Sequence, residues 1–524
     1  MVKNMRDGGE RDLLLVGVWG FPGNWFRANY MPLKPPQEIR KWPKFVEWEN
    51  IRREVTSHST TLSMARFLED EGWNVKTLIY GMDTLACPGR ARELEDEIQE
   101  LILRFRDSPP RQYKEILERA AEVLRLYVKS YSEEVELKAN SIDISIVPGI
   151  GTFRLAGGVI RYQFLGSITT CSVSLELDLY EKLKESECRA VILDISHGIN
   201  YLPSLALETL NRAVRVYSAL TGSPIGFAVC NGDPVMSSGQ NSVIHLVRAQ
   251  LVEETPFSLL APPGLILPER SVKMLERRRP PEHVRTFEDG YREVRRRLER
   301  FTYSASKVAT HGLVLYLVTQ LSNMRVGEDW LSPLQRVVEG VKQLINLREV
   351  SSTANLVKVG YSYSLEPDLP IISYLSDLVE KLVEKAPELE ETEVSEIGRA
   401  KLVDLEDLKR YAEEVAGLKQ PAKRLFEYEI SNIEKRVCGL RRIFKEGGVE
   451  LLSTIHSLAD KCEEELESVR RECIKKLCQI DRRNFYAHAG MEMNSVVVSV
   501  SDGRILVGYP EKCLEELSKI VSDP

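Results

Sequence analysis

The chain has 524 residues, of which 43% are hydrophobic and 28% are charged. This length favours two or three domains, and the composition is that of a globular protein with buried cores. The formal net charge of −7 argues against a protein that coats duplex nucleic acid, so any nucleic acid is expected to meet a local groove.

The sequence contains no sign of a membrane or secreted protein. No apolar run reaches the roughly 20 residues that span a bilayer, and the polar segment 1–11 does not resemble a signal peptide. The nine cysteines form no C-x-x-C pairs, which argues against a zinc knuckle or a disulfide framework. We therefore expect a cytoplasmic protein with buried or free thiols.

The first part of the chain has the pattern of an α/β domain. Short apolar runs predict strands, and Ser59, Thr60 and Thr61 precede an amphipathic run whose first turn they can cap. Alternating strands and helices predict a mostly parallel, doubly wound sheet. The predicted strands are 13–18, 75–80, 142–147, 190–193 and 225–230, and the predicted helical segments are 62–70, 90–135 (a hairpin) and 204–220.

The pattern changes after residue 245. Residues 246–295 are predicted to form a linker, with a helix-turn-helix as an alternative, and the helical period continues beyond residue 291 as far as 489. An acidic stretch at 377–396 is expected to be an exposed helical insertion. Strands at 496–500 and 504–509 flank an Asp-Gly pair, which predicts a β-hairpin. The expected domains are thus 1–245, an α/β sensing domain, and 296–524, a helical domain with a small hairpin.

One stretch of the chain is rich in arginine. It can line a groove for nucleic acid, or it can be a solvated basic helix paired with Glu293 and Glu299. The arginines are Arg277, Arg278, Arg279, Arg285, Arg292, Arg295, Arg296, Arg297 and Arg300.

Three loops are expected at the carboxyl ends of predicted strands, where open α/β sheets bind ligands: 19–29, 148–152 and 194–201. Two of them precede helices, whose free N–H groups suit phosphate. The glycine spacing does not match a dinucleotide fingerprint, which argues against a nicotinamide or flavin enzyme. The turn 194–200 crowds an acid, a hydroxyl, an imidazole and an amide together, and such a density of polar groups indicates a ligand.

That turn reads D-x-S-H-G-x-N, and the first strand ends in a G-x-P-x-x-W loop. Here the chain resembles the CARF domain, and as a whole it resembles the CARF–HEPN ribonucleases of type III CRISPR systems. The resemblance implies a Rossmann-like domain that dimerises and binds a cyclic oligoadenylate, usually the tetra-adenylate, as an allosteric activator rather than a cofactor. The activator-binding residues are then expected to be Trp19, Gly20, Pro22, Asn24, Trp25, Ser59, Thr60, Thr61, Gly149, Gly151, Thr152, Ser196, His197, Gly198 and Asn200.

The HEPN nuclease signature is an arginine followed by a histidine after four to six residues. The chain has this spacing at Arg53…His58, Arg278…His283 and Arg483…His488. Prolines break the second, and a β-branched, Ser-rich stretch lies within the first. Only the third ends a helical run in the helical lobe, and it reads R-N-x-x-A-H-A-G, the fuller form typical of the family.

The third motif has the groups that RNA cleavage needs. On a helix, Asn484 and His488 lie on one face and Arg483 flanks it. Histidine can act as general base or acid, arginine can hold the phosphate, and Asn484 can orient either group. We expect metal-independent cleavage of single-stranded RNA that leaves a 2′,3′-cyclic phosphate, at a cleft formed by two protomers. The cationic residues can alternatively stabilise the end of a helix that Gly490 terminates.

Two other functions remain open at the level of sequence. One is a ligand-gated transcription regulator that binds DNA through 246–300. The other is a small-molecule α/β enzyme with a helical oligomerisation lobe. The function inferred from the resemblance, a CRISPR antiviral endoribonuclease, implies a homodimer or a higher oligomer of dimers.

Overall fold

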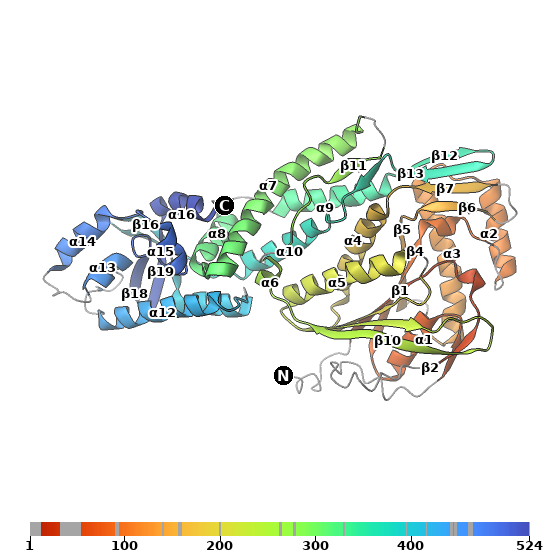
Figure 1. Cartoon of the computed structure of the whole chain (residues 1–524), viewed down its shortest axis with the longest axis horizontal. Coiled ribbons are helices and arrows are strands. Elements are labelled where there is room, and N and C mark those ends of the chain that lie inside the picture. The colour runs from red at the N-terminus through yellow and green to blue at the C-terminus, as the bar shows by residue number, and fades with distance from the viewer. Residues whose placement is uncertain are drawn as a thin grey trace. The chain divides into compact units, whose positions relative to one another are not determined.

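A computed structural model of the chain divides into two compact units (Figure 1). Unit 1 comprises 1–253, 268–291 and 337–370, and unit 2 comprises 254–267, 292–336 and 371–524. The structure describes residues 12–31, 54–89, 94–138, 141–155, 160–198, 201–260, 265–275, 279–327, 331–394, 396–415, 417–440, 444, 448–458 and 465–522.

Unit 1 is built on an eight-stranded sheet in which five adjacent strands, reaching one edge, are parallel to one another. All five were predicted from sequence, and their bounds agree to within two residues. The order across the sheet is β3 (Val55–Ser57), β2 (Ala28–Met31), β10 (Asn241–Val252), β9 (Ile225–Gly232), β8 (Ala190–Asp194), β1 (Asp12–Val18), β4 (Asn74–Met82) and β5 (Ile142–Val147). The predicted boundary at residue 245 thus falls inside β10.

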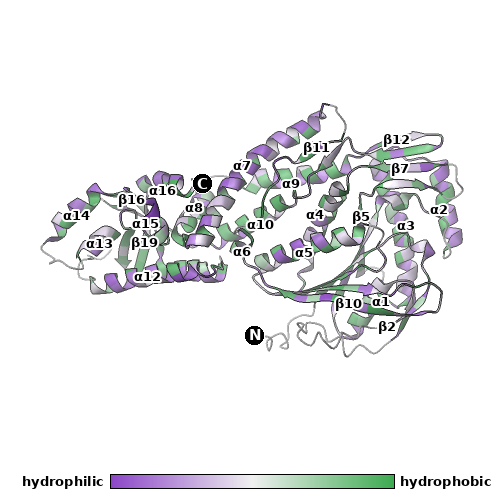
Figure 2. Cartoon of the chain, viewed as in Figure 1, coloured by the Kyte–Doolittle hydropathy of each residue, from purple (hydrophilic) through white to green (hydrophobic). Residues whose placement is uncertain are grey.

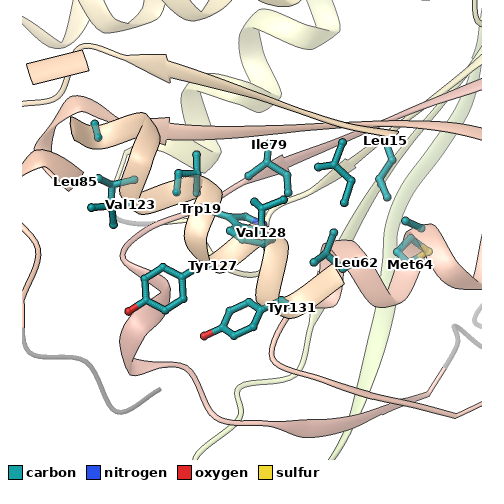
Figure 3. Close-up of a cluster of buried hydrophobic side chains, with 14 of the residues drawn as sticks. Leu15, Trp19, Leu62, Met64, Ile79, Leu85, Val123, Tyr127, Val128 and Tyr131 are labelled. Atoms are coloured by element: carbon teal, nitrogen blue, oxygen red, sulfur yellow. The ribbon is translucent and has the colours of Figure 1, made fainter. Parts of the chain in front are cut away.

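Side chains alternate across the central sheet, so each strand faces two helical layers. Leu15 and Ile79 lie on one face, in a cluster with Leu62 of α1 (Thr60–Asp70) and Tyr127 and Tyr131 of α3 (Tyr113–Glu134) (Figure 3). The predicted hairpin of 90–135 is confirmed as α2 (Glu95–Asp107) and α3. The helices α4 (Ile168–Ser186) and α5 (Leu202–Thr221) pack against each other and also contact β1. Their residues do not belong to this cluster.

A second sheet of unit 1 corrects the prediction of continuous helix beyond residue 291. Its strands β12 (Glu349–Thr353) and β13 (Leu356–Gly360) form a hairpin, and β13 pairs in parallel with β7 (Arg161–Leu165). Val357 and Val359 are buried and Lys358 between them is exposed, which is the period of a strand with one buried face. The order is β12 (Glu349–Thr353), β13 (Leu356–Gly360), β7 (Arg161–Leu165) and β6 (Gly151–Arg154), and β11 (Val272–Met274) pairs separately with β14 (Tyr363–Leu365).

Unit 2 surrounds a five-stranded antiparallel sheet with helices. The predicted Asp-Gly hairpin is confirmed as β18 and β19, with Asp502 and Gly503 both at positive φ. The strands in order are β15 (Glu390–Val394), β16 (Gly398–Asp404), β19 (Arg504–Pro510), β18 (Val497–Ser501) and β17 (Val449–Leu451). The helices of this unit include α6 (Pro256–Leu260), the part of α7 (Glu282–His311) from residue 292 on, α8 (Val314–Gly327), α10 (Ile371–Glu384), α11 (Leu405–Arg410), α12 (Ala422–Gly439), α13 (Leu452–Leu458), α14 (Leu466–Lys475), α15 (Arg482–Ala487) and α16 (Leu514–Ser522).

The expected exposed helical insertion at 377–396 is wrong. Leu378, Val379 and Leu382 of α10 are buried because they lie at helical spacing on the core face, and β15 follows as an edge strand. The acidic residues that suggested an insertion lie on the outside of these elements and on the connection between them.

The helix-turn-helix alternative for 246–295 is also wrong within the described residues. These hold the end of β10, the short α6 (Pro256–Leu260), β11 and the start of α7 (Glu282–His311), and not two consecutive helices joined by a turn. Hydrophilic and hydrophobic bands alternate along α7 (Figure 2). Glu293 pairs with Arg297 and Glu299 with Arg295, which supports the solvated basic helix. Arg277 and Arg278 lie outside the described residues.

Two further findings concern the cysteines and the membrane. A disulfide joins Cys478 to Cys513, which corrects the expectation of thiols at these two positions. The free cysteines of the described residues are Cys87, Cys171, Cys188, Cys230 and Cys473, all buried, and the exposed Cys438. Among the described helices, none is both long and apolar enough to cross a membrane.

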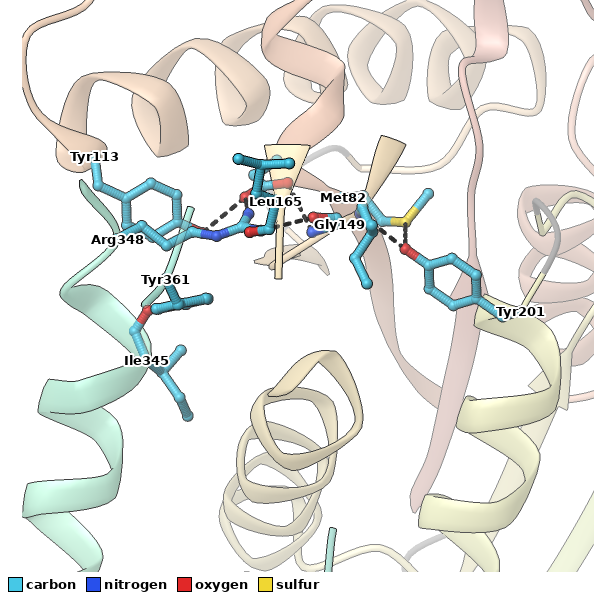
Figure 4. Close-up of polar contacts among 10 residues, drawn as sticks. Met82, Tyr113, Gly149, Leu165, Tyr201, Ile345, Arg348 and Tyr361 are labelled. Carbon is cyan, nitrogen blue, oxygen red and sulfur yellow. Dashed lines mark hydrogen bonds and ion pairs between the residues drawn. The ribbon is translucent and has the colours of Figure 1, made fainter. Parts of the chain in front are cut away.

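A buried ion pair joins distant parts of unit 1. Arg348, which follows α9 (Leu331–Asn346), pairs with Asp83, and their side chains are 1% and 0% exposed. The guanidinium also donates to the carbonyl oxygens of Gly149 (2.8 Å) and Leu165 (3.0 Å), beside Tyr113 (Figure 4). The second Asp83 oxygen accepts the Gly149 N–H at 2.7 Å. This pair therefore fixes the loop that leaves β5.

We predict that Arg348→Met lowers the free energy of unfolding by about 3–5 kcal/mol, because it leaves the Asp83 carboxylate buried without a counter-ion. The matched control is Arg104→Met, which removes an exposed pair with Glu122 and should change stability by less than about 1 kcal/mol. Urea unfolding of the full chain measures both. Equal losses in the two variants would contradict the role assigned to Arg348.

Candidate functional site

The first candidate site lies at the carboxyl ends of β1 and β8, which are adjacent parallel strands. The loop after β1 and the turn after β8 meet there as predicted. The Gly20 N–H donates to the carbonyl of His197 at 2.9 Å, and the Trp25 ring stacks on the His197 imidazole with centroids 3.9 Å apart. Trp19 is fully buried instead, and its indole N–H donates to Thr61.

Asp194, the last residue of β8, joins this turn to α1. One carboxylate oxygen accepts the hydroxyls of Thr60 and Thr61, each at 2.6 Å, and the other accepts the Ser196 N–H at 3.0 Å. The Ser59 hydroxyl caps α1 by accepting the N–H of Leu62. The hydroxyl protons of Thr60 and Thr61 are therefore used within the protein in this conformation.

His197 is held as a neutral ring. Burial lowers its pKa to about 4, and the nearby His58 acts in the same direction, while Asp194 opposes this shift. Its Nε2 accepts the N–H of Thr60 at 3.0 Å, which places the ring proton on Nδ1. At neutral pH, His197 thus offers an anionic ligand a ring surface and one N–H, and no full charge.

The remaining predicted residues are spread around this centre. Pro22 is buried and its carbonyl accepts the Tyr131 hydroxyl, whereas Asn24 is exposed. A side chain at Gly198 would meet Pro203 at 2.1 Å, so the turn requires glycine there. Asn200 lies outside the described residues.

One hydrogen bond links the loop after β5 to Tyr201, the residue that follows the turn after β8. The Ile150 N–H donates to the Tyr201 hydroxyl at 3.0 Å, next to the Gly149 backbone that Arg348 and Asp83 hold (Figure 4). Gly151 and Thr152 belong to β6 and pair with β7 in the second sheet. Tyr201, which directly follows the turn, thus connects it to this loop, whereas Gly151 and Thr152 are engaged in the second sheet.

Sequence reasoning missed three residues beside this site. The His58 ring stacks on Tyr131 at 4.6 Å, and its Nδ1 lies 2.8 Å from the Glu134 carboxylate. Tyr131 could have been noticed from its spacing of four residues from Tyr127 on α3, which brings two aromatic rings to one face of the helix. His58 belongs to the first R-x4-H pattern, whose Arg53 lies outside the described residues, and it is buried in unit 1.

The second candidate site lies in unit 2, on α15. Arg483 and Asn484 are exposed, and the buried Phe485 anchors the helix. The helix is a separate short element rather than the end of a long one, because Asp481 caps it by accepting the N–H of Asn484 at 2.8 Å. His488 follows at its C-terminus and is 45% exposed. Gly490, at φ 81°, ends the turn as expected.

Three residues near His488 were not singled out from sequence. Nδ1 of His488 lies 3.1 Å from the carboxylate of Glu429, which α12 carries. His456 of α13 is close by: burial lowers its pKa to about 4, and the charges of Arg436 and His488 act in the same direction. Glu429 could have been noticed in the sequence as an acidic residue that shares a helical stripe with the apolar Phe426, Ile430 and Ile433.

Glu492 also lies near His488. Burial raises the pKa of the Glu492 carboxyl, while the Asn494 N–H and the charge of His488 oppose that shift. Its carboxylate accepts the Asn494 N–H at 2.8 Å. Within the part of the chain that the structure describes, no three His, Cys, Asp or Glu side chains are arranged to hold a metal ion.

Two partly buried histidines, His197 and His456, predict an acid-sensitive fold. The pKa values of His197 and His456 are about 4, below the ordinary value of 6.5, so the unfolded chain binds protons that the folded chain refuses. Stability should therefore fall as the pH drops from about 7 towards 4. We expect His197→Gln and His456→Gln each to flatten this fall in urea midpoints measured across that range. Slopes identical to wild type in both variants would contradict it.

Comparison with known families matches both sites to known domains. Residues 14–234 match the family described as CRISPR system endoribonuclease Csx1, CARF domain. Residues 419–511 match the family described as CRISPR system endoribonuclease Csx1, HEPN domain, and include Glu429, Arg483 and His488. No curated protein matches the chain. With a CARF domain around the Asp194 turn and a HEPN domain around α15, the chain belongs to the CARF–HEPN endoribonucleases of CRISPR systems.

Proposed function

We propose that the chain is an endoribonuclease of type III CRISPR antiviral defence that cuts single-stranded RNA when a cyclic oligoadenylate binds its CARF domain. Cyclic tetra-adenylate is the activator we favour. The cleavage needs no metal ion and leaves a 2′,3′-cyclic phosphate and a 5′-hydroxyl. The active form is a cytoplasmic homodimer, in which two copies of α15 form one cleft.

The observation that carries this proposal is the arrangement of Arg483 and His488 at an exposed helix end within the HEPN match. Arg483 is accessible to a phosphate, which a guanidinium binds through two parallel hydrogen bonds. His488 is half-exposed and its Nδ1 is engaged, so the other ring nitrogen is the one left for a substrate. These groups supply proton transfer and charge stabilisation on their own.

The proposed activator site is supported by the contacts around Asp194. The turn after β8, the loop after β1 and the N-terminus of α1 are joined there by hydrogen bonds, so a ligand that displaces one of them acts on the others. Trp25 is partly exposed, and its indole is the kind of ring on which adenine stacks. The assignments from Trp19 to Asn200 made above remain predictions.

The alternative of a DNA-binding regulator has less support. It relied on a helix-turn-helix within 246–300, where the described residues hold strands and the single long α7. Two partly buried arginines of α7, Arg295 and Arg297, also pair with neighbouring glutamates. The proposed nuclease accounts for both matched domains, and a regulator accounts only for the first.

We predict that Arg483→Ala and His488→Ala each reduce RNA cleavage by at least 100-fold without changing activator binding, because each removes a group needed in the transition state. His283→Ala is the control, since it destroys the second R-x4-H pattern at an exposed residue of α7. Gel assays of a labelled RNA and end-group analysis of the products measure the effect. Wild-type cleavage by His488→Ala would refute the assignment.

We predict that His197→Ala raises the cyclic tetra-adenylate concentration for half-maximal cleavage by about tenfold. The substitution removes the hydrogen bond from the Thr60 N–H to Nε2 and the stacking partner of Trp25. The rate at saturating activator should remain near that of wild type, because the cleaving residues belong to another domain. Titration of activator against RNA cleavage and against direct binding gives both values. An unchanged half-maximal concentration would mean that the activator binds elsewhere.

A further inference from the structure

The carboxylate of Glu429 occupies a position that a helix normally gives to an apolar residue. The buried residues of α12 are Ala422, Phe426, Glu429, Ile430, Ile433 and Val437, which form one stripe along the helix. The Glu429 side chain is only 10% exposed. A carboxylate in such a place destabilises the fold unless it is paired.

Within the described residues, the hydrogen-bond partner of this carboxylate is His488. The distance from Oε1 to Nδ1 is 3.1 Å. An ionised carboxylate can only accept a hydrogen bond, so the imidazole nitrogen that faces it must carry a proton. This contact selects the Nδ1–H tautomer of neutral His488 and leaves the lone pair on Nε2.

We propose that Glu429 is a positioning residue of the nuclease, which fixes the tautomer and the orientation of His488 for attack on RNA. The inference rests on the proposed function, since it assigns the roles of the two ring nitrogens in that reaction. Nε2 takes the proton of the 2′-hydroxyl while the 2′-oxygen bonds to phosphorus and the bond from phosphorus to the 5′-oxygen breaks. Water protonates the departing 5′-oxygen, and solvent then recovers the proton from Nε2.

The imidazolium formed in this step is stabilised by the same contact. Its Nδ1–H faces a negative charge in a largely buried place, where the interaction is stronger than in water. The Asp–His pair of serine proteases uses a carboxylate in this way. The other acid near His488, Glu492, accepts the N–H of Asn494 and makes no hydrogen bond to the ring among those observed.

The first test compares Glu429→Gln with Glu427→Gln in the full-length protein with cyclic tetra-adenylate. Glu427 lies two residues away on α12 and makes an exposed pair with Lys423, so its loss should leave kcat within about twofold of wild type. Glu429→Gln keeps the shape and removes the charge. Its kcat should fall about 10- to 100-fold, with KM for RNA and activator binding unchanged. Glu429→Asp keeps the charge and should recover part of the loss.

The second test observes the tautomer directly. In ¹⁵N NMR of histidine-labelled protein, the His488 signals are identified by their absence from His488→Gln. Wild type should show protonated Nδ1 and unprotonated Nε2 above the pH at which the ring loses its charge, and Glu429→Gln should show a mixture. A wild-type ring with its proton on Nε2 overturns the inference, whatever the Glu429→Gln variant does.

The remaining outcomes are also decisive. A fall in kcat with an unchanged tautomer in Glu429→Gln would overturn the positioning role and leave a structural one. An unchanged kcat in that variant would overturn it as well. If wild type cuts no RNA, the proposed function fails, and the tautomer measurement still decides whether Glu429 selects the Nδ1–H form.

Discussion

The first candidate site, at the ends of β1 and β8, depends on the hydrogen bonds of the buried Asp194 carboxylate. It is 2% exposed at the end of β8 and receives two hydroxyl hydrogen bonds from α1. Gly17, its neighbour on β1, makes this possible, because a side chain there would meet Thr61 at 2.6 Å. Strand, helix and turn are therefore held as one piece, and His197 takes its orientation from that piece.

Much of unit 1 could be predicted because its signals are local. Short stretches of four to six residues that are rich in apolar side chains mark each parallel strand, and a parallel sheet brings their carboxyl ends to one edge. The position of Arg348 could not be predicted in this way. It lies more than 260 residues after Asp83, and only the folded sheet brings the two together. The β12–β13 hairpin was missed because its short alternating pattern lies within a long helical context.

Only part of the candidate nuclease site could likewise be predicted from the sequence. Arg483 and His488 share one short segment, so a motif could locate them, whereas Glu429 comes from another helix 59 residues away. An isolated acid on an apolar stripe is visible in the sequence, but its partner is not. The local structure of the motif was also only partly predictable. The Asp481 cap begins a separate six-residue helix, and the preceding disulfide partner Cys478 has positive φ, which no periodicity indicated.

In the proposed function, a cyclic oligoadenylate switches on RNA cleavage that needs no metal. The most direct test of this function is cleavage of a labelled single-stranded RNA by the wild-type protein in EDTA, without activator and with cyclic tri-, tetra- or hexa-adenylate. We expect little cleavage by the protein alone and strong cleavage with one of the three rings, cyclic tetra-adenylate being the ring we favour. Equal cleavage with and without all three rings, or cleavage that appears only when magnesium is restored, would contradict it.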